Sequence, residues 1–85
     1  MNVPSLAELG LSDVCYVVRG NDSNGNPWIT RLFVGAGQYP SESTARIEAG
    51  LKAIRMNRLG ANVKAVRQVH GEHGWVDDIE IEGQP

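Results

Sequence analysis

Two histidines and a carboxylate stand close together in the segment His-Gly-Glu-His at residues 70–73. Imidazole nitrogens and carboxylate oxygens bind transition metals and transfer protons near neutral pH. The spacing is typical of a turn and lacks the helical i, i+4 arrangement that would direct both rings toward one ligand. A metal site would need further ligands from elsewhere, such as Cys15 or Asp77. We therefore interpret the segment as a solvent-exposed hairpin tip and predict no metal.

Oxygen-bearing side chains occupy alternate positions from Asp22 to Asn26, as at the start of a calcium-binding loop. An EF-hand loop needs glycine at its sixth position and a bidentate glutamate at its twelfth. Counted from Asp22, these positions hold Pro27 and Phe33, so the calcium interpretation fails. The Asn24-Gly25 pair is instead typical of a two-residue type I′ turn, which predicts a hairpin.

The single cysteine, Cys15, cannot form an intrachain disulfide, which favours a reducing compartment. It stands among valines, where a thiol acts as a small apolar side chain, and no neighbouring base would lower its pKa. The chain also lacks a nucleophile elbow, a P-loop and a dinucleotide fingerprint. We predict a non-enzymatic protein without cofactors. A metal-dependent or thiol enzyme using Cys15, His70 or His73 ranks third among the hypotheses.

Apolar periodicity and capping signals predict the elements that position these residues. Ser41 or Ser43 would cap the main helix and Gly60 would end it. The predicted elements are a short helix from the capping box at 5–8, strands at 14–18 and 28–34, the main helix at 43–59, and strands at 63–70 and 75–82. This α+β order, αββαββ, predicts one domain over 1–85, with a small antiparallel sheet of two hairpins and the main helix packed on one face.

The predicted turn sets the register of the first hairpin and places Tyr16 opposite Phe33. One face would carry Cys15, Val17, Leu32 and Val34, and the other Val14, Tyr16, Val18 and Phe33. One helix covers only one face, so the other needs the N-terminal segment, a second copy or a partner. Tyr16 and Phe33 are therefore candidate partner contacts.

The main helix shows an apolar stripe at Ile47, Leu51 and Ile54, which follows the i, i+4, i+7 pattern of a buried face. We expect this stripe to pack on the sheet. Glu48 and Lys52 stand in the favourable order for an i, i+4 ion pair.

Charge is unevenly distributed in a chain of net charge −2. Residues 71–85 contain acids and no base, and the last strand would present Asp78, Glu80 and Glu82 on one face, opposite Trp75, Ile79 and Ile81. Such a row fits a basic partner surface. The alternative, a nucleic-acid-binding module, would use the basic segment that contains Arg46, Lys52, Arg55, Arg58, Lys64 and Arg67.

These features predict a small protein-binding module that acts as a regulator or inhibitor by docking on a basic protein. One version of this hypothesis has a partner protein that handles nucleic acid. A second copy is a further candidate partner, nucleic acid ranks lower, and the absence of a long apolar run predicts no membrane partner and a cytoplasmic location. In size, mild acidity and layout the chain resembles accessory proteins of phages and mobile elements, including anti-CRISPR inhibitors. That resemblance rests on no motif and implies only inhibition by binding.

Overall fold

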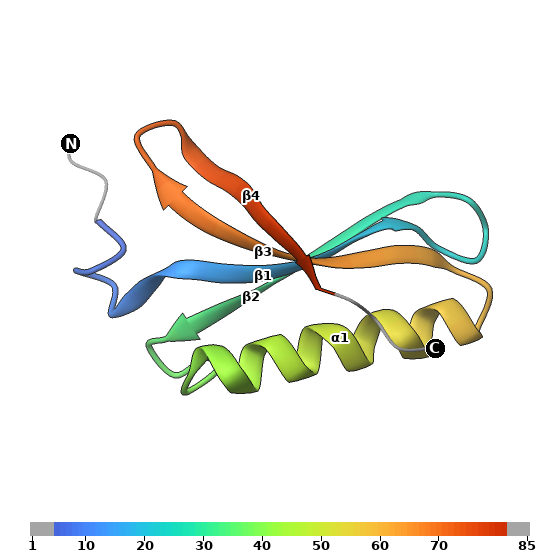
Figure 1. Ribbon diagram of the computed structural model, residues 1–85, viewed down its shortest axis with the longest axis horizontal. Coiled ribbons are helices and arrows are strands. Elements are labelled where there is room, and N and C mark those ends of the chain that lie inside the picture. The colour runs from blue at the N-terminus through green and yellow to red at the C-terminus, as the bar shows by residue number, and fades with distance from the viewer. Residues whose placement is uncertain (1–4, 82–85) are drawn as a thin grey trace.

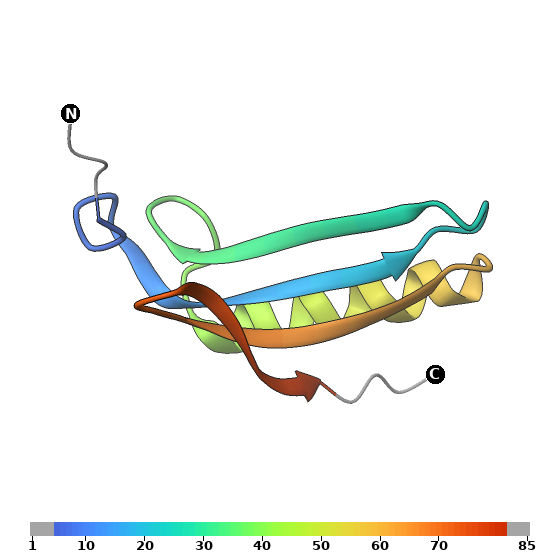
Figure 2. The same ribbon diagram turned by 90° about the horizontal axis from the view of Figure 1, so that it is seen from above.

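The computed structural model describes residues 5–81 as one antiparallel sheet with a helix on one face (Figure 1). Its elements are β1 (Leu11–Asn21), β2 (Pro27–Gly35), α1 (Glu42–Arg58), β3 (Asn62–Gly71) and β4 (Gly74–Ile81). The strand order is β2-β1-β3-β4, so α1 connects an edge strand to the inner strand β3. Figure 2 shows α1 running behind the inner strands, and α1 contacts β1, β2 and β3. The predicted α+β class, the two hairpins and the covering helix are confirmed.

The predicted N-terminal helix is a single hydrogen-bonded turn, so the element order is ββαββ. Ser5 Oγ accepts a hydrogen bond from the Glu8 amide at 3.2 Å, as expected of a cap. Gly10 then adopts a φ of 74°, and the Leu11 amide donates to the Leu6 carbonyl at 2.8 Å, which ends the turn. One turn repays little of the cost of helix nucleation, so the αββαββ prediction is wrong.

The turn of the first hairpin also differs from the predicted two-residue type I′ turn. The Gly25 amide donates to the Asp22 carbonyl at 2.9 Å, and Gly25 has a φ of 81°. Asn24 lacks the positive φ that a type I′ turn requires, since Ala36 is the only described non-glycine residue with positive φ. The connection is a type I turn followed by a glycine bulge, and it is one residue longer than the predicted two-residue turn.

This longer turn shifts the register of the hairpin by one residue. Tyr16 pairs with Leu32 instead of Phe33, and Cys15 pairs with Phe33. Because side chains alternate between faces, the shift moves each β2 side chain to the opposite face from the one predicted. The helix-facing side of the first hairpin carries Val14, Tyr16, Val18, Leu32 and Val34.

The core lies between this face and an alanine row on α1. Ala45, Ala49 and Ala53 are buried at i, i+4, i+8. The remaining buried members of the core are Val63, Ala65 and Ile81. The predicted burial of the stripe is wrong for Ile47, which is 60% exposed, and for Leu51, which is 37% exposed, whereas Ile54 is half-buried. Alanine is short enough to let the helix approach a sheet face that already carries Tyr16 and branched aliphatic side chains.

Both ends of α1 follow the sequence signals. Ser41 Oγ accepts from the Thr44 amide at 3.2 Å, and Gly60 has a φ of 99° just beyond the last turn. The Asn57 side chain accepts from the Val63 amide at 2.8 Å and donates to the Val63 carbonyl at 3.0 Å, which fixes the start of β3 to the helix. Glu48 and Lys52 form no ion pair within the described chain, contrary to prediction.

The helix-free face of the sheet is covered by its own side chains. Cys15 and Val17 are fully buried there, and Val66 and Gln68 are nearly so. Long side chains from neighbouring strands reach across this face: Arg19 of β1 donates to Asp77 of β4, and Arg31 of β2 donates to Gln68 of β3. The expectation that this face requires a partner or a second copy is therefore wrong.

Candidate protein-binding surfaces

The acidic side chains of β4 do not form the predicted row, because a β-bulge interrupts the strand. Arg67 pairs with Ile79 and Gln68 with Asp77, which leaves Asp78 as the extra residue. Asp78 forms an ion pair with Arg67 on the helix side, whereas Glu80 lies 3.7 Å from Lys64 on the other side. The bulge also places Trp75 on the helix-free face, away from the core residue Ile81. Glu82 lies outside the described residues.

A polar network with one side chain from each strand crosses the helix-free face. Arg19 of β1 donates to both carboxylate oxygens of Asp77 on β4, one bond being 2.9 Å. Gln68 of β3 donates to Asp77 Oδ1 at 2.8 Å and accepts from Arg31 of β2 at 3.1 Å. The hydrogen bonds from Arg19 and then from Gln68 lower the pKa of Asp77 to about 2. The network is therefore a fixed, ionised clamp across the sheet.

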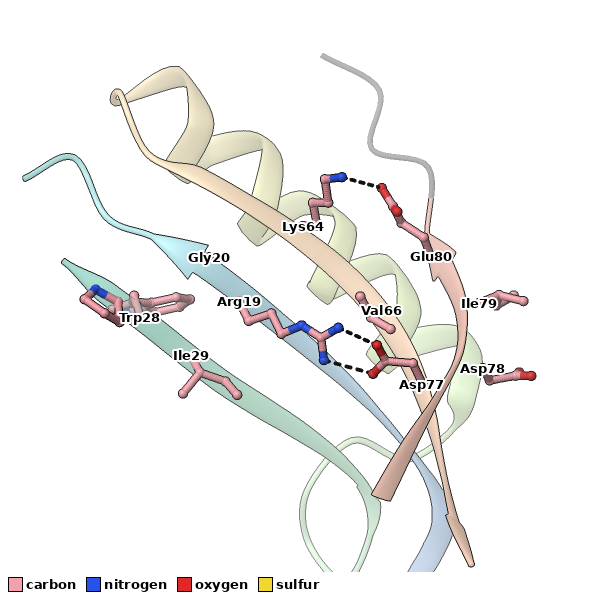
Figure 3. A pocket seen from close by; sticks show the side chains of 11 residues that line it. Arg19, Gly20, Trp28, Ile29, Lys64, Val66, Asp77, Asp78, Ile79 and Glu80 are labelled. Atoms are coloured by element: carbon pink, nitrogen blue, oxygen red, sulfur yellow. Dashed lines mark hydrogen bonds and ion pairs between the residues drawn. The ribbon is translucent and has the colours of Figure 1, made fainter. Parts of the chain in front are cut away.

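A groove of about 660 Å³ lies beside this clamp on the same face (Figure 3). Trp28 and Ile29 of β2 form one wall, residues 77–80 of β4 form the other, and Gly20 and Val66 lie between them. Gly20 is required because a Cβ there would lie 2.1 Å from the Asn62 carbonyl oxygen. No buried side-chain nitrogen or oxygen of residues 5–81 lacks a hydrogen-bond partner. The described residues therefore leave no buried side-chain polar atom of the groove without a partner.

An aromatic cluster occupies the other end of the helix-free face. The Trp75 ring lies 6.1 Å from the Phe33 ring and 5.0 Å from His70, with the Arg31 guanidinium 5.7 Å from its centre. Phe33, a predicted partner contact, is half-buried in this cluster. Within the cluster, the rings pack against one another and the Arg31 guanidinium lies over the Trp75 ring.

Tyr16, the second predicted aromatic contact, is inaccessible. Only 2% of it is exposed, beneath α1, and its hydroxyl donates to Glu42 Oε1 at 3.3 Å. Burial raises its pKa. A partner could reach this side chain only by opening the core, so its assignment as a contact is corrected.

The candidate catalytic and metal-binding residues stand apart. Cys15 is 0% exposed in the middle of β1, and burial raises the pKa of its thiol. His70 packs on Trp75, while His73 lies in the turn after β3. The Asp22 carboxylate accepts from the Asn24 and Asn26 amides at 2.9 and 3.0 Å, which shows its role in the turn. Within residues 5–81, no three metal-binding side chains converge.

The six bases of the nucleic-acid alternative do not share one surface. Lys64 is near Glu80, and Arg67 lies 3.1 Å from Glu42 as well as contacting Asp78. The remaining four project from α1 and form no ion pair with any other residue between 5 and 81: Arg46, Lys52, Arg55 and Arg58.

These four bases border the apolar stripe on α1, in which Ile47 and Leu51 are exposed and Ile54 is half-buried. We call Ile47, Leu51 and Ile54, with their four basic neighbours, the helix outer surface. Gly50 lies beside the stripe, and a Cβ at that position would meet nothing within 4 Å. The sequence predicts both the stripe and the bases, but it predicts that the stripe packs on the sheet. The competing signal was the alanine row, which has the same helical spacing.

No described helix is long and apolar enough to cross a membrane. Comparison of the chain with protein-family models, curated proteins and solved structures finds no match.

Proposed function

We propose that this chain is a small protein-binding module that regulates or inhibits its partner by occupying a surface, and that it binds through the helix outer surface. The supporting observation is the exposure of Ile47 and Leu51 on a helix whose inner face is already filled by alanine. A contiguous exposed apolar row on a soluble fold marks an interaction site more often than a scattered apolar residue does. Helix-in-groove recognition uses anchors at this i, i+4, i+7 spacing.

The charge around the stripe indicates the chemistry of the partner. Four bases flank it, and Glu48 is the acid among them. The complementary surface is an apolar groove with an acidic rim, because opposite charges at an interface rim speed association and reject wrong partners. This replaces the basic partner expected from β4, whose acids Asp77, Asp78 and Glu80 already contact bases of the same chain.

Nucleic-acid binding remains the alternative, and the helix outer surface argues against it. Bases alone suffice for phosphate contacts, and an exposed aliphatic stripe between them adds nothing to such contacts. The resemblance to phage and mobile-element inhibitors stays a prediction based on size and layout.

Photocrosslinking tests the proposed surface. A benzoylphenylalanine at position 47 should crosslink to one acidic protein in cells that carry the gene, whereas the same group at Val76, which is 52% exposed on β4, should not. Equal crosslinking from both positions would contradict the assignment, and crosslinked nucleic acid would promote the alternative.

Affinity measurements with the identified partner provide the second step. Leu51→Glu should weaken binding at least tenfold, because it places a charge in the apolar centre of the interface, where truncation of a hot-spot residue costs about 2 kcal/mol or more. Val76→Glu is the matched control and should bind as the parent does. Arg55→Glu should mainly slow association and reduce its salt dependence. Parent-like binding by Leu51→Glu would refute this surface.

A further inference from the structure

The two edges of the sheet are protected very differently. The β4 edge carries a bulge and the acids Asp77, Asp78 and Glu80, which are devices that keep sheet edges from pairing. The β2 edge runs unbroken from Pro27 to Gly35, and its pairing with β1 is regular from Cys15 to Asn21. Its single charged residue is Arg31, and its single proline stands at the first position.

The hairpin geometry determines which β2 backbone groups point outward. The Asp22 amide donates to the Asn26 carbonyl at 2.8 Å, and hydrogen-bonded pairs recur at every second position of an antiparallel ladder. By this alternation Trp28, Thr30 and Leu32 direct their amides and carbonyls to β1. Residues 29, 31 and 33 direct theirs to the open edge.

Part of that edge is already covered. The Phe33 carbonyl accepts from the Tyr39 amide at 3.2 Å, and the Gly35 amide donates to the Tyr39 carbonyl at 2.8 Å, so the loop after β2 occupies the edge from Phe33 onward. This contact independently shows that the Phe33 carbonyl points outward. The described chain supplies no backbone partner for the amides and carbonyls of Ile29 and Arg31.

We propose that a second copy of this chain pairs antiparallel with this edge, about a two-fold axis at Thr30. In that register, Ile29 exchanges two hydrogen bonds with Arg31 of the second copy, and Arg31 exchanges two with Ile29 of the second copy. The amides and carbonyls of Ile29 and Arg31 on each copy are then satisfied. Thr30 faces its own counterpart, a favourable cross-strand pair.

The neighbouring registers fail on chemistry visible in the chain. An axis at Arg31 would place like charges opposite each other and drive Ile29 against Phe33, whose edge the Tyr39 loop covers. An axis at Ile29 would set the Arg31 carbonyl against Pro27, which has no amide hydrogen. The axis at Thr30 alone avoids both conflicts.

The pairing also gives the exposed Ile29 side chain a neighbour. Ile29 is 60% exposed on the helix-free face and would lie beside the aliphatic stem of Arg31 from the second copy. A two-fold axis perpendicular to the sheet keeps both helices on one side of a continuous sheet. The helix outer surface stays free, so the dimer does not depend on the proposed function.

Sedimentation velocity on the full chain tests the dimer. We expect the mass to rise from monomer to dimer with increasing concentration, because one short strand pair buries little area and dissociates on dilution. Ile29→Pro removes only an outward-facing amide and should keep the chain monomeric, as should Ile29→Lys, which keeps the backbone intact if the proline variant fails to fold. Val76→Lys, a change of similar exposure on the β4 edge, should dimerise like the parent.

Disulfide mapping tests the register. Opposed residues of a non-hydrogen-bonded antiparallel pair have Cα atoms about 4.5 Å apart, within the range of a disulfide. Thr30→Cys should therefore link to itself across the dimer on mild oxidation, and Leu51→Cys on α1 should not. The proposal is overturned by a chain that stays monomeric at every concentration, by a dimer that survives Ile29→Lys, or by crosslinking through position 51 instead of 30.

Discussion

Asp77 shows how a single side chain ties the sheet together. It accepts from Arg19 two strands away and from Gln68 on the adjacent strand, and Gln68 in turn pairs with the buried Cys15 of β1. Its neighbour Asp78 points to a different base because of the bulge. The two consecutive aspartates thus form ion pairs on opposite faces of β4, Asp77 with Arg19 and Asp78 with Arg67, so both carboxylates already contact a base of the same chain.

The Asp77 carboxyl should remain ionised well into acid. Its pKa of about 2 in the folded chain lies below the ordinary value of 3.8. A depressed folded-state pKa contributes stability above the unfolded-state pKa, and this contribution is lost as pH falls from about 4 toward 2. Carboxyl-carbon NMR titration should give an Asp77 pKa of about 2, and Arg19→Met should raise the Asp77 pKa toward its ordinary value of 3.8. Lys64→Met, which does not contact Asp77, serves as control, and an unshifted pKa in Arg19→Met would disprove the cause.

The Cys15 thiol should be unreactive in the folded protein. It is enclosed in the sheet, and its raised pKa reduces the thiolate that thiol reagents attack. We expect alkylation of Cys15 to proceed only at the rate of unfolding, as measured by quenched labelling and mass spectrometry. The thiol of an Ile47→Cys variant, at a position that is 60% exposed, gives the internal reference for rapid labelling. Equally fast labelling of Cys15 in the parent would show that the helix-free face opens readily.

At the scale of elements, α1 carries two apolar rows of similar helical spacing, and they have different roles. The alanine row sets the distance between helix and sheet, and the second row exposes Ile47 and Leu51 while Ile54 is half-buried. A helix in which the larger side chains face solvent leaves the hydrophobic gain of those side chains available for binding.

Substitutions on the two rows should have opposite consequences for stability. Ala49→Leu overfills a fully buried position and should destabilise the fold by about 1–3 kcal/mol. Ile47→Ser removes an exposed side chain and should change stability by no more than about 0.5 kcal/mol. Urea unfolding followed by circular dichroism separates the two outcomes. The reverse ranking would mean that the outward row packs against the protein.

At the scale of the whole molecule, the two proposed interfaces use different parts of one sheet-and-helix layer. Edge pairing through β2 would place two copies of the helix outer surface on the same side of a joint sheet. Linking two sites in this way raises the effective concentration of the second contact.

The dimer should therefore bind a densely immobilised partner more tightly than the monomeric Ile29→Lys variant does. Avidity predicts slower dissociation of the parent from a high-density biosensor surface, and equal affinities of parent and variant for the same partner free in solution. A weaker solution affinity of Ile29→Lys would instead place the β2 edge within the partner interface itself.

Signals confined to a few neighbouring residues were sufficient to predict most elements. Caps at Ser41 and Gly60 and the strand on each side of the 72–73 turn follow from backbone groups that must be satisfied locally. The N-terminal segment was predicted as a helix and forms a single turn, because the local capping signals contain no information about how little one turn stabilises itself.

Tertiary structure alone decided which side of each element is buried. The Asn24-Gly25 pair suits both a type I′ turn and a type I turn with a bulge, and the choice between them reverses every side chain of β2. Likewise, either row of α1 could have faced the sheet by periodicity. The sheet face occupied by Tyr16 accommodates the short alanine row. The bulge at Asp78 lets Asp77 pair with Arg19 and Asp78 pair with Arg67, which lie on other strands. These choices depend on the close packing of residues distant in sequence, and periodicity within one element contains no information about that fit.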